Sequence, residues 1–402
     1  MTNRLSRWQK FPWRENNQFQ LLIDGSEFFP AMLAAINSAQ SQILLEMYLI
    51  ESGKLADSFI TALAEAAKRE VNVYLLFDDY GARDFEQKDR NRLDEAGIHT
   101  VYYNPIGFWN PVLVWGWRRT LLRDHRKLLV VDDQVVFLGG MGITDNFDNT
   151  LTPENYWHDV AVKANGPVIY DWLTVFQSNW DTWTKKQYPV AVDSFSHKTT
   201  VSNNISPGQA GRVAAGRYFG RSEIQRAFVK RVLGAEHHVW MMTAYFVPMS
   251  RLLRALRLAA RRGVDVRLLV PGPETDHPSI RYAGRRHFYH LLRAGVRIFE
   301  YQPRFMHAKV LLCDDWVSLG SSNVDRWNLR WNLEGNQEIE DSVFTHEVRD
   351  LFENDFRDCT ECVLQDWHSR SWIGRWREWF WGRMETLIET LSEILRRYRD
   401  KS

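Results

Sequence analysis

The sequence has 402 residues, of which 45% are hydrophobic and 25% are charged. This is the usage of an ordinary globular protein, and the length predicts two or three domains. The 51 basic and 50 acidic residues give a formal net charge of +1, which argues against a wholly basic nucleic-acid binder. The balance is uneven along the chain, because residues 206–305 hold 18 Arg and Lys against 6 Asp and Glu. That surplus predicts an anionic partner for the second half, either a lipid or a nucleic acid.

The first half alternates apolar patterns of helical and strand period, and glycines end some of the helices. One such stop is Gly97, directly after a predicted helix. In chain order we expect a helix at 28–39, a strand at 42–50, a helix at 55–68, a strand at 71–77, a helix at 87–96 and a strand at 99–103. A Trp-rich loop follows, and then we expect strands at 127–131, 135–138 and 159–163 and a helix at 168–180.

The second half repeats this order of elements. We expect a helix at 224–233, a strand at 238–246, a helix at 251–261, a strand at 264–270, a helix at 282–293, strands at 296–301, 308–313, 316–319 and 336–340 and a helix at 347–356. A duplication of about 180 residues with alternating β and α units predicts an α/β fold of two pseudo-symmetric lobes, each an α-β-α sandwich around a mixed sheet. We place the lobes at 1–190 and 212–365, a Ser-, Asn-, Thr- and Gly-rich linker at 191–211 and an amphipathic tail at 366–402.

The chain contains only three cysteines, which excludes a disulfide framework and fits a reducing compartment. Cys359 and Cys362 form a lone C-x-x-C pair with no second pair and no ligating histidine nearby, so we expect two residues of a helix and no zinc site. Residues 1–10 are polar and lack the apolar core of a signal peptide, and no apolar run reaches the roughly 18 residues that span a bilayer. We therefore expect a cytoplasmic protein with peripheral membrane attachment, if any.

One chemical motif, H-x-K-x4-D, occurs once in each half. On a strand, residues i and i+2 project to the same face, so each histidine is expected beside its lysine, while the aspartate at the far end can fix the following turn. A single such motif is more often structural, but two copies at matching places, each followed by a glycine turn, favour a catalytic role. The first copy is His125, Lys127 and Asp132 before Gly139-Gly140, and the second is His307, Lys309 and Asp314 before Gly320-Ser321-Ser322-Asn323.

With these paired motifs, residues 18–365 resemble the phospholipase D superfamily. Within that superfamily the chain looks most like bacterial cardiolipin synthases of the type without N-terminal transmembrane helices. The resemblance implies a duplicated phospholipase D-type sandwich with the active site between the lobes. It also implies transfer of a phosphatidyl group to phosphatidylglycerol, which gives cardiolipin, with glycerol leaving when phosphatidylglycerol is also the donor. The supporting phrases are Ile43-Leu-Leu-Glu46, Tyr156-Trp-His-Asp-Val160, Ala244-Tyr-Phe-Val-Pro248 and Asn332-Leu-Glu334.

The paired histidines suit a phosphodiester displacement. One imidazole can attack phosphorus to form a phosphohistidine, while the other protonates the leaving alkoxide and later deprotonates the acceptor. The lysines can bind the nonbridging oxygens and stabilise the developing charge. The resemblance assigns His125 as nucleophile and His307 as general acid/base, an order that the residues alone do not give. We expect no metal and no cofactor, because fixed cations and amides supply what Mg²⁺ supplies elsewhere.

Two carboxylates follow the motifs. Asp159 lies 34 residues after His125, and Glu334 lies 27 residues after His307. A histidine nucleophile needs an acceptor on its other ring nitrogen, which fixes the tautomer and stabilises the cation. The resemblance implies that Asp159 and Glu334 orient the motif histidines. The alternative is that they are surface carboxylates at strand edges.

The glycine turns differ between the copies. The superfamily pattern has Ser and Asn after the glycine, as in Ser321 and Asn323, whereas the first copy has Gly140 and Gly142 at these places. We therefore expect an asymmetric phosphate site, with the side chains of Ser321 and Asn323 on one side and backbone N–H groups at Gly140 on the other. The departure puts the turnover rate in doubt more than the type of reaction.

Three segments bear on the choice between lipid and nucleic acid. Residues 104–117 are apolar, aromatic and free of charge, unlike the aromatic and cationic channels that hold nucleic acids, and fit a lipid contact or a buried loop. Residues 372–398 have apolar side chains at helical spacing, and their first half mixes Trp with Arg as interfacial helices do. Packing on the body or on a partner helix is the alternative. The helix at 251–261 has four arginines on one side, which suits an anionic leaflet or plain solvent.

These segments favour a lipid. We expect phosphatidylglycerol as substrate, with phosphatidylethanolamine as a second candidate donor, and an anionic membrane surface as partner on the cytoplasmic side of the bacterial cell membrane. We expect no nucleic acid. The alternatives are a phospholipase D-type hydrolase, another phosphatidyltransferase, a metal-independent nuclease of the superfamily and a non-catalytic membrane-binding protein. The oligomeric state stays open, because both motifs lie in one chain.

Overall fold

The computed structural model describes residues 11–105, 122–185, 187–188, 190, 209–216, 223–325, 332–369, 372 and 376–384. The first half contains β1 (Arg14–Ile23), α1 (Gly25–Ser38), β2 (Gln42–Met47), α2 (Lys54–Lys68), β3 (Asn72–Asp78), α3 (Gln87–Glu95), β4 (His99–Tyr103), β5 (Lys127–Val131), β6 (Val135–Gly139), the 3₁₀ turn η1 (Asp145–Phe147), β7 (Val160–Asn165) and α5 (Val168–Thr184).

The second half contains β8 (Gln209–Gly216), α6 (Glu223–Gly234), β9 (His238–Met242), β10 (Phe246–Val247), α7 (Ser250–Arg261), β11 (Asp265–Pro271), α8 (Pro278–Arg285), α9 (Phe288–Leu292), β12 (Arg297–Tyr301), β13 (Val310–Cys313), β14 (Trp316–Gly320), β15 (Val324–Asp325), β16 (Glu334–Glu340), α11 (Ser342–Arg357), β17 (Cys359–Cys362) and α12 (Leu364–Ser369). Among the described residues, no helix is long and apolar enough to cross a membrane.

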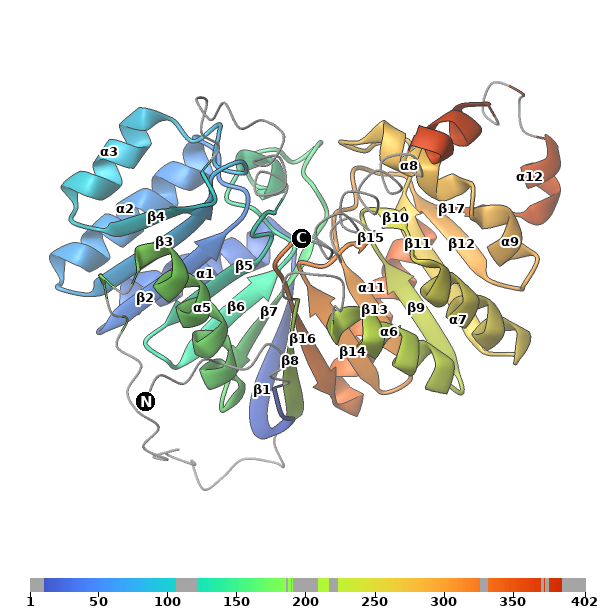
Figure 1. Ribbon diagram of the computed structural model, residues 1–402, viewed down its shortest axis with the longest axis horizontal. Helices are drawn as coiled ribbons and strands as arrows, with labels where there is room; N and C mark the ends of the chain where they lie inside the picture. Colours follow the sequence, from blue (N-terminus) through green and yellow to red (C-terminus); the bar gives the residue numbers. More distant parts are fainter. Residues whose placement is uncertain are drawn as a thin grey trace, which may run out of the picture.

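The described strands form one large mixed sheet in the order β17-β12-β11-β9-β13-β14-β16-β8-β1-β7-β6-β5-β2-β3-β4, apart from the short pair β10-β15. In each half, three parallel strands are followed by antiparallel ones, and the order in the second half mirrors that in the first. The halves meet where β1 pairs with β8, at the junction of the two lobes in Figure 1. The predicted duplication and the mixed sheets are therefore confirmed.

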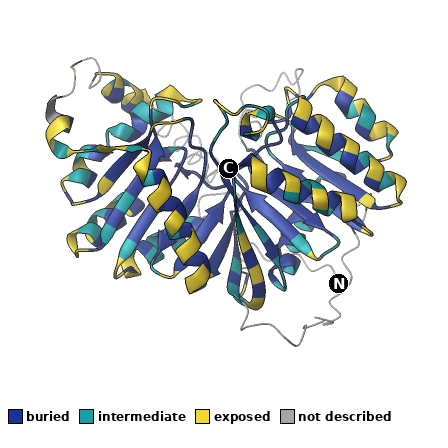
Figure 2. Ribbon diagram, turned by 180° about the vertical axis from the view of Figure 1, so that it is seen from behind, coloured by how far each residue is buried: buried dark blue, intermediate teal, exposed yellow. Residues whose placement is uncertain are grey.

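Helices cover both faces of the sheet, because the strands are buried on both sides and need apolar cover. On one face, α5 and α11 share a single apolar cluster with strands of both halves. On the other face, α1 and α2 form one cluster with the first half, while α6 and α7 form another with the second half. Figure 2 shows the buried strands between helices whose outer sides are exposed. The predicted α-β-α sandwich is confirmed, with a core that is continuous across the lobes.

Two strands at the junction were not predicted. β1 has the sequence RENNQFQLLI, whose polar first half hides the strand pattern, and β8 consists largely of small residues. Their pairing partners come from remote parts of the chain: β1 pairs with β7 and β8, and β8 also pairs with β16. β8 begins at Gln209, two residues before the predicted end of the linker, and residues 191–208 lie outside the described part of the chain.

Three predicted elements need correction. Cys359 and Cys362, predicted in a helix, lie on β17, which pairs antiparallel with β12. The predicted helix at 282–293 is divided into α8 and α9, and its chain tightens where the His287 N–H bonds to the Gly284 carbonyl (3.0 Å). The predicted strand at 238–246 is divided into β9 and β10, because the second segment leaves the main sheet and pairs with β15.

Candidate active site

Each motif histidine lies just before a central strand of its half. His125 precedes β5, which lies between β2 and β6, and His307 precedes β13, which lies between β9 and β14. The backbone of each histidine is held by the opposite half. The N–H of His125 donates to the carbonyl of Leu333 (2.9 Å), and the N–H of His307 donates to the carbonyl of His158 (2.7 Å). The two motifs therefore meet at the junction between the lobes.

The histidines exchange carboxylate partners across that junction. Nδ1 of His125 lies 3.1 Å from the carboxylate of Glu334, and Nδ1 of His307 lies 2.7 Å from Oδ2 of Asp159. Both carboxylates are buried at the starts of β16 and β7. The predicted orienting pair is in contact with the histidines, but each carboxylate serves the histidine of the other half. With Nδ1 on the carboxylate, Nε2 of each histidine is the nitrogen on the far side of the ring, and in His307 it also lies 2.9 Å from Nζ of Lys309.

Each motif lysine lies against its own histidine. Nζ of Lys127 donates to the carbonyl of His125 (2.6 Å), and Nζ of Lys309 lies 2.7 Å and 2.9 Å from the two ring nitrogens of His307. Burial lowers the pKa of Lys127 to about 7 and that of Lys309 to about 8, against the opposing charges of Glu334 and Asp159. An anionic phosphate between these lysines would favour their charged forms.

The histidines are neutral at neutral pH in the free enzyme. Burial lowers the pKa of His307 to about 4, and the charge of Lys309 adds to this effect. Burial also lowers the pKa of His125, although Glu334 opposes the shift. A neutral imidazole has the lone pair that attack on phosphorus requires. The negative charge of a bound phosphodiester would raise both pKa values, so that a histidine can act as an acid.

Among the described residues, more aromatic rings contact His307 than His125. The ring of Tyr48 meets His125 edge-on, with centroids 4.6 Å apart. His307 has three aromatic neighbours: its centroid lies 5.2 Å from Phe147, 5.6 Å from Trp157 and 5.6 Å from Phe305. Apolar rings around a reacting group exclude water. Both histidines are in addition largely buried, with 8% and 7% of their surface exposed.

The glycine turns take different roles in the two halves. Both amide atoms of Asn323 are buried with no partner among the described residues, as expected of a group that binds substrate phosphate. The Ser321 hydroxyl, predicted to bind phosphate, instead donates to the carboxylate of Glu334. Gly140 faces Asp159 in the corresponding place, and a Cβ added there would lie 2.5 Å from Oδ2 of Asp159. The two turns therefore also contact the orienting carboxylates differently, through a serine hydroxyl at Glu334 and through a glycine at Asp159.

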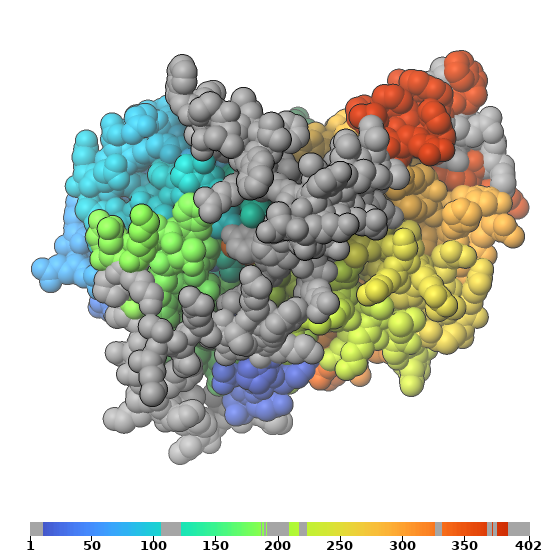
Figure 3. Space-filling model, in the orientation of Figure 1, coloured from blue at the N-terminus to red at the C-terminus, as the bar shows by residue number. Residues whose placement is uncertain are grey.

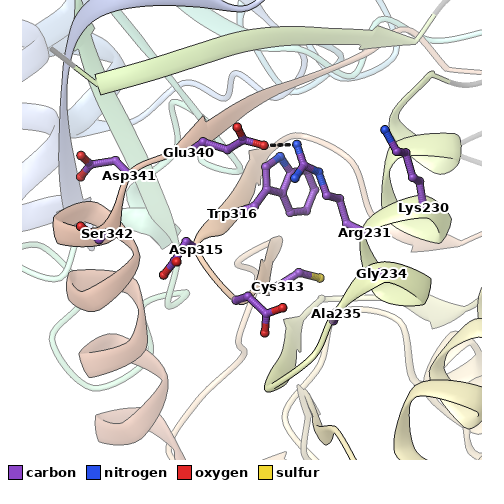
Figure 4. Close-up of a pocket in the computed structure, with 11 residues that line it drawn as sticks. Lys230, Arg231, Gly234, Ala235, Cys313, Asp315, Trp316, Glu340, Asp341 and Ser342 are labelled. Carbon is purple, nitrogen blue, oxygen red and sulfur yellow. Dashed lines mark hydrogen bonds and ion pairs between the residues drawn. The ribbon is translucent and has the colours of Figure 1, made fainter. Parts of the chain in front are cut away.

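The motif aspartates lie at the far ends of their strands. Asp132 follows β5 and accepts hydrogen bonds from the N–H groups of residues 40–42, at 2.8–3.0 Å. Asp314 follows β13 and accepts in the same way from residues 236–238, at 2.9–3.0 Å. We grouped both with the catalytic residues, but the contacts found for them hold the turn before the neighbouring strand. Asp314 lines a cavity of about 550 Å³ at this end. Figure 4 shows Trp316 and Arg231, which also line it.

A buried polar network behind His125 was not predicted. Arg126 Nη2 lies 2.7 Å from Oε1 of Glu46, and Arg126 Nε lies 3.2 Å from Oδ1 of Asp124. The amide of Asn179 donates to the same Glu46 oxygen (2.8 Å). Glu46 lies in the apolar strand β2, so a lone acid in an apolar run was the sequence signal for this network.

We compared the chain with known proteins. Residues 32–180 and 228–356, which include both motifs, match the family described as "Cardiolipin synthase, PLD-like domain". The chain belongs to this family. Cardiolipin synthase B of Salmonella typhimurium is 35% identical over 377 residues, which cover 90% of this chain and 86% of the relative. Cardiolipin synthase B of Escherichia coli (strain K12) is 36% identical over 351 residues, which cover 85% and 81%. The predicted family is therefore confirmed.

A solved structure agrees with the fold. Phosphatidylserine synthase of Haemophilus influenzae superposes with a TM-score of 0.70 and covers 96% of each chain. At 14% sequence identity, this likeness bears on the fold alone. Together with the family match, it confirms the predicted phospholipase D-type architecture.

Proposed function

We propose that this protein is a cardiolipin synthase that transfers a phosphatidyl group to phosphatidylglycerol through a phosphohistidine. The observation that carries the proposal is the pair of buried His–carboxylate contacts, His125–Glu334 and His307–Asp159, each made across the lobe junction. Membership of the cardiolipin synthase family supports the substrate class. The result is a site with two held imidazoles, two lysines and an amide, that of Asn323, that has no partner among the described residues, and together these groups suit a phosphodiester.

In the first step, the donor phosphate lies between Lys127 and Lys309, with the amide of Asn323 as a further ligand. Nε2 of His125 attacks phosphorus, so that a P–N bond forms while the bond from phosphorus to the headgroup oxygen breaks. His307 gives its Nε2 proton to that leaving oxygen. The Glu334 carboxylate, in contact with Nδ1 of His125, stabilises the positive charge of the phosphohistidine.

In the second step, the headgroup hydroxyl of phosphatidylglycerol gives its proton to Nε2 of His307, and its oxygen attacks phosphorus. The P–N bond breaks, and His125 returns to its neutral form. Asp159 holds the imidazolium of His307 through Nδ1 in the meantime. The rings of Trp157 and Phe305 around His307 favour an organic acceptor over water. The Trp-rich loop at 104–117, which we predict to contact lipid, lies largely outside the described residues.

The decisive experiment uses purified protein, metal-free buffer and phosphatidylglycerol vesicles, with the products separated by mass. We expect cardiolipin together with free glycerol, and neither product from the His125→Ala variant. Phosphatidic acid alone would mean that water wins at the phosphohistidine and that the enzyme is a hydrolase. Cardiolipin only after addition of phosphatidylethanolamine would assign that lipid as donor.

The order of the histidines needs a second measurement. His125→Ala should abolish both turnover and the covalent phosphoenzyme, whereas His307→Ala should slow departure of the leaving group and activation of the acceptor. Acid quenching of each variant with labelled lipid detects the covalent species. A phosphoenzyme trapped on His125→Ala would show that the roles are reversed.

We also propose that the C-terminal tail contacts an anionic membrane surface. Residues 376–384 are helical, and Trp376 and Trp379 expose 55% and 56% of their surface. The polar side of this helix rests on α8, where Arg285 Nε lies 3.1 Å from Oε1 of Glu378. Figure 3 shows the end of the described chain, in red, projecting at the edge of the molecule. Exposed tryptophans beside arginines suit the interface of a bilayer.

A further inference from the structure

A third histidine lies buried behind His307. His158 is 3% exposed and bridges two carboxylates: its Nδ1 lies 2.8 Å from Oδ1 of Asp24, and its Nε2 lies 3.2 Å from Oδ2 of Asp355. Asp24 precedes α1 in the first half, whereas Asp355 lies on α11 in the second half. Because ionised carboxylates only accept hydrogen bonds, both ring nitrogens must donate, and the imidazole is a cation.

This cluster holds the backbone of both members of the His307 pair. The carboxylate of Asp24 that binds His158 also accepts from the N–H of Asp159 (3.1 Å). The N–H of Asp24 donates back to the carbonyl of Asp159 (2.9 Å). The carbonyl of His158 accepts from the N–H of His307 (2.7 Å). A change in the cluster would therefore shift His307 and Asp159 relative to each other.

The backbone is strained at Asp24, which contacts His158. This residue occupies the N-cap of α1, where an aspartate usually accepts from the first free N–H groups of the helix, yet its side chain makes no capping bond. Its φ of 61° and ψ of 169° lie in a region that residues other than glycine rarely adopt, so the backbone is strained there. The Asp24 carboxylate thus contacts His158 and the N–H of Asp159 instead of capping its own helix.

Other residues take the places of His158 and Asp24 in the described part of the His125 side. Leu333 takes the place of His158, because its carbonyl accepts from the N–H of His125 (2.9 Å). Gly216 pairs with Glu334 where Asp24 lies beside Asp159. The charged network beside the His125 motif has a different composition, with Arg126 between Glu46 and Asp124 and, within the described ranges, no histidine between two carboxylates. In the described part of the chain, a histidine held between two aspartates thus lies beside His307 and not beside His125.

We propose that His158, held as an imidazolium between Asp24 and Asp355, is a positioning residue that aligns His307 with Asp159 across the lobe junction. The proposal rests on the proposed function only in giving His307 a step in phosphodiester chemistry. Burial by itself lowers the pKa of His158, but Asp355 and Asp24 outweigh it and raise the pKa to about 10. The charge of the cluster is thus constant through the neutral pH range in which the reacting groups exchange protons.

The test compares His158→Gln with Leu333→Ala, its matched control in the other half. Two donors are used, phosphatidylglycerol and phosphatidyl 4-nitrophenol, whose leaving group needs no proton from an acid. With His125 as nucleophile, His158→Gln should slow cardiolipin formation by about tenfold or more, as expected for impaired acid–base catalysis. With phosphatidyl 4-nitrophenol, the same variant should still release one equivalent of 4-nitrophenolate in a burst, as we expect for His307→Ala. Asp355→Asn should give the same pattern and serves if His158→Gln does not fold.

Equal slowing with both donors and a lower melting temperature, as expected for Leu333→Ala, would reduce His158 to a structural role and overturn the proposal. Unchanged rates for both donors would overturn it as well. Loss of the burst in both His158→Gln and His307→Ala would support the positioning role and reverse the order of the histidines. If the wild type gave a burst but no cardiolipin, the proposed function would be refuted. The role of His158 would still be decided, by comparing the burst and the 4-nitrophenolate turnover of the variants with those of the wild type.

Discussion

At the scale of single residues, burial lowers the pKa of both motif histidines and both motif lysines. Burial lowers the pKa of Lys127 and Lys309 to about 7 and about 8, and that of His307 to about 4. At slightly alkaline pH, these two lysines have therefore lost part of their positive charge in the free enzyme. A phosphodiester carries the negative charge that restores it, so binding of the substrate and uptake of protons are coupled.

This coupling predicts how activity depends on pH. A lysine with a lowered pKa loses its charge as the pH rises, so kcat/KM should fall above pH 7–8 through loss of the charge of Lys127 and then of Lys309. Rates at low substrate concentration between pH 5 and 10 measure this. Lys127→Arg keeps its charge in this range and should be slower overall but without the first decline. A profile that stays flat to pH 10 would contradict the prediction.

His158 predicts a pH dependence of stability with a definite sign. The pKa of His158 rises from 6.5 to about 10 on folding. The stability that its charge contributes to the folded protein is therefore fully present below about pH 6.5 and is lost as the pH approaches 10. The difference in unfolding free energy between the wild type and His158→Gln should narrow over that range, by at most about 1.4 kcal/mol per pH unit. Urea unfolding at pH 6, 8 and 10 measures it. A constant difference would show that His158 is not charged in the folded protein.

At the scale of elements, the C-terminal helix is held by polar contacts and leaves its aromatic side chains outside. Arg285 and Arg286 of the α8 segment contact Glu378 and the carbonyl of Gly382. Trp376 stacks on Phe380, with ring centroids 5.4 Å apart, yet stays more than half exposed. One side of this helix packs on the body, and the other side is exposed. Packing on the body and contact with a bilayer, which the sequence presents as alternatives, are therefore compatible.

The exposed face predicts a defined loss of membrane binding. Trp376→Ser combined with Trp379→Ser should weaken pelleting with anionic vesicles at least about tenfold, because burial of one aromatic side chain contributes about 2 kcal/mol. Activity on detergent-dispersed substrate should persist. Val343→Ser is the control, since this apolar side chain is 65% exposed but lies on α11. Deletion of residues 369–402 should act like the double variant, and undiminished pelleting would refute the membrane contact.

At the scale of the whole molecule, the two halves depend on each other for their chemistry. Each histidine takes its carboxylate partner and the acceptor of its backbone N–H from the other half. The β1–β8 pairing and the apolar cluster shared by α5 and α11 hold the halves in this register. The site exists only where both halves are correctly docked.

This dependence predicts the behaviour of a divided chain. Residues 1–190 contain His125 without Glu334, and residues 191–402 contain His307 without Asp159. Neither fragment alone should form a phosphoenzyme as a monomer, whereas the co-expressed fragments should recover it. Acid quenching after separation by size measures the covalent species. A monomeric fragment that forms it would show that the reciprocal contacts are dispensable.

The sequence by itself determined the duplication, most elements, the family and the paired motif, because these depend on local periodicity and on residue spacing. The strands β1 and β8 were not predicted from the sequence, because their polar or small residues show no strand pattern and their pairing partners are remote in sequence. Only the tertiary structure decided which carboxylate serves which histidine, because Asp159 and Glu334 are equally placed in their halves and the exchange arises from docking. It also placed Asp132 and Asp314 at the far strand ends and joined Asp24, His158 and Asp355, residues up to 331 positions apart.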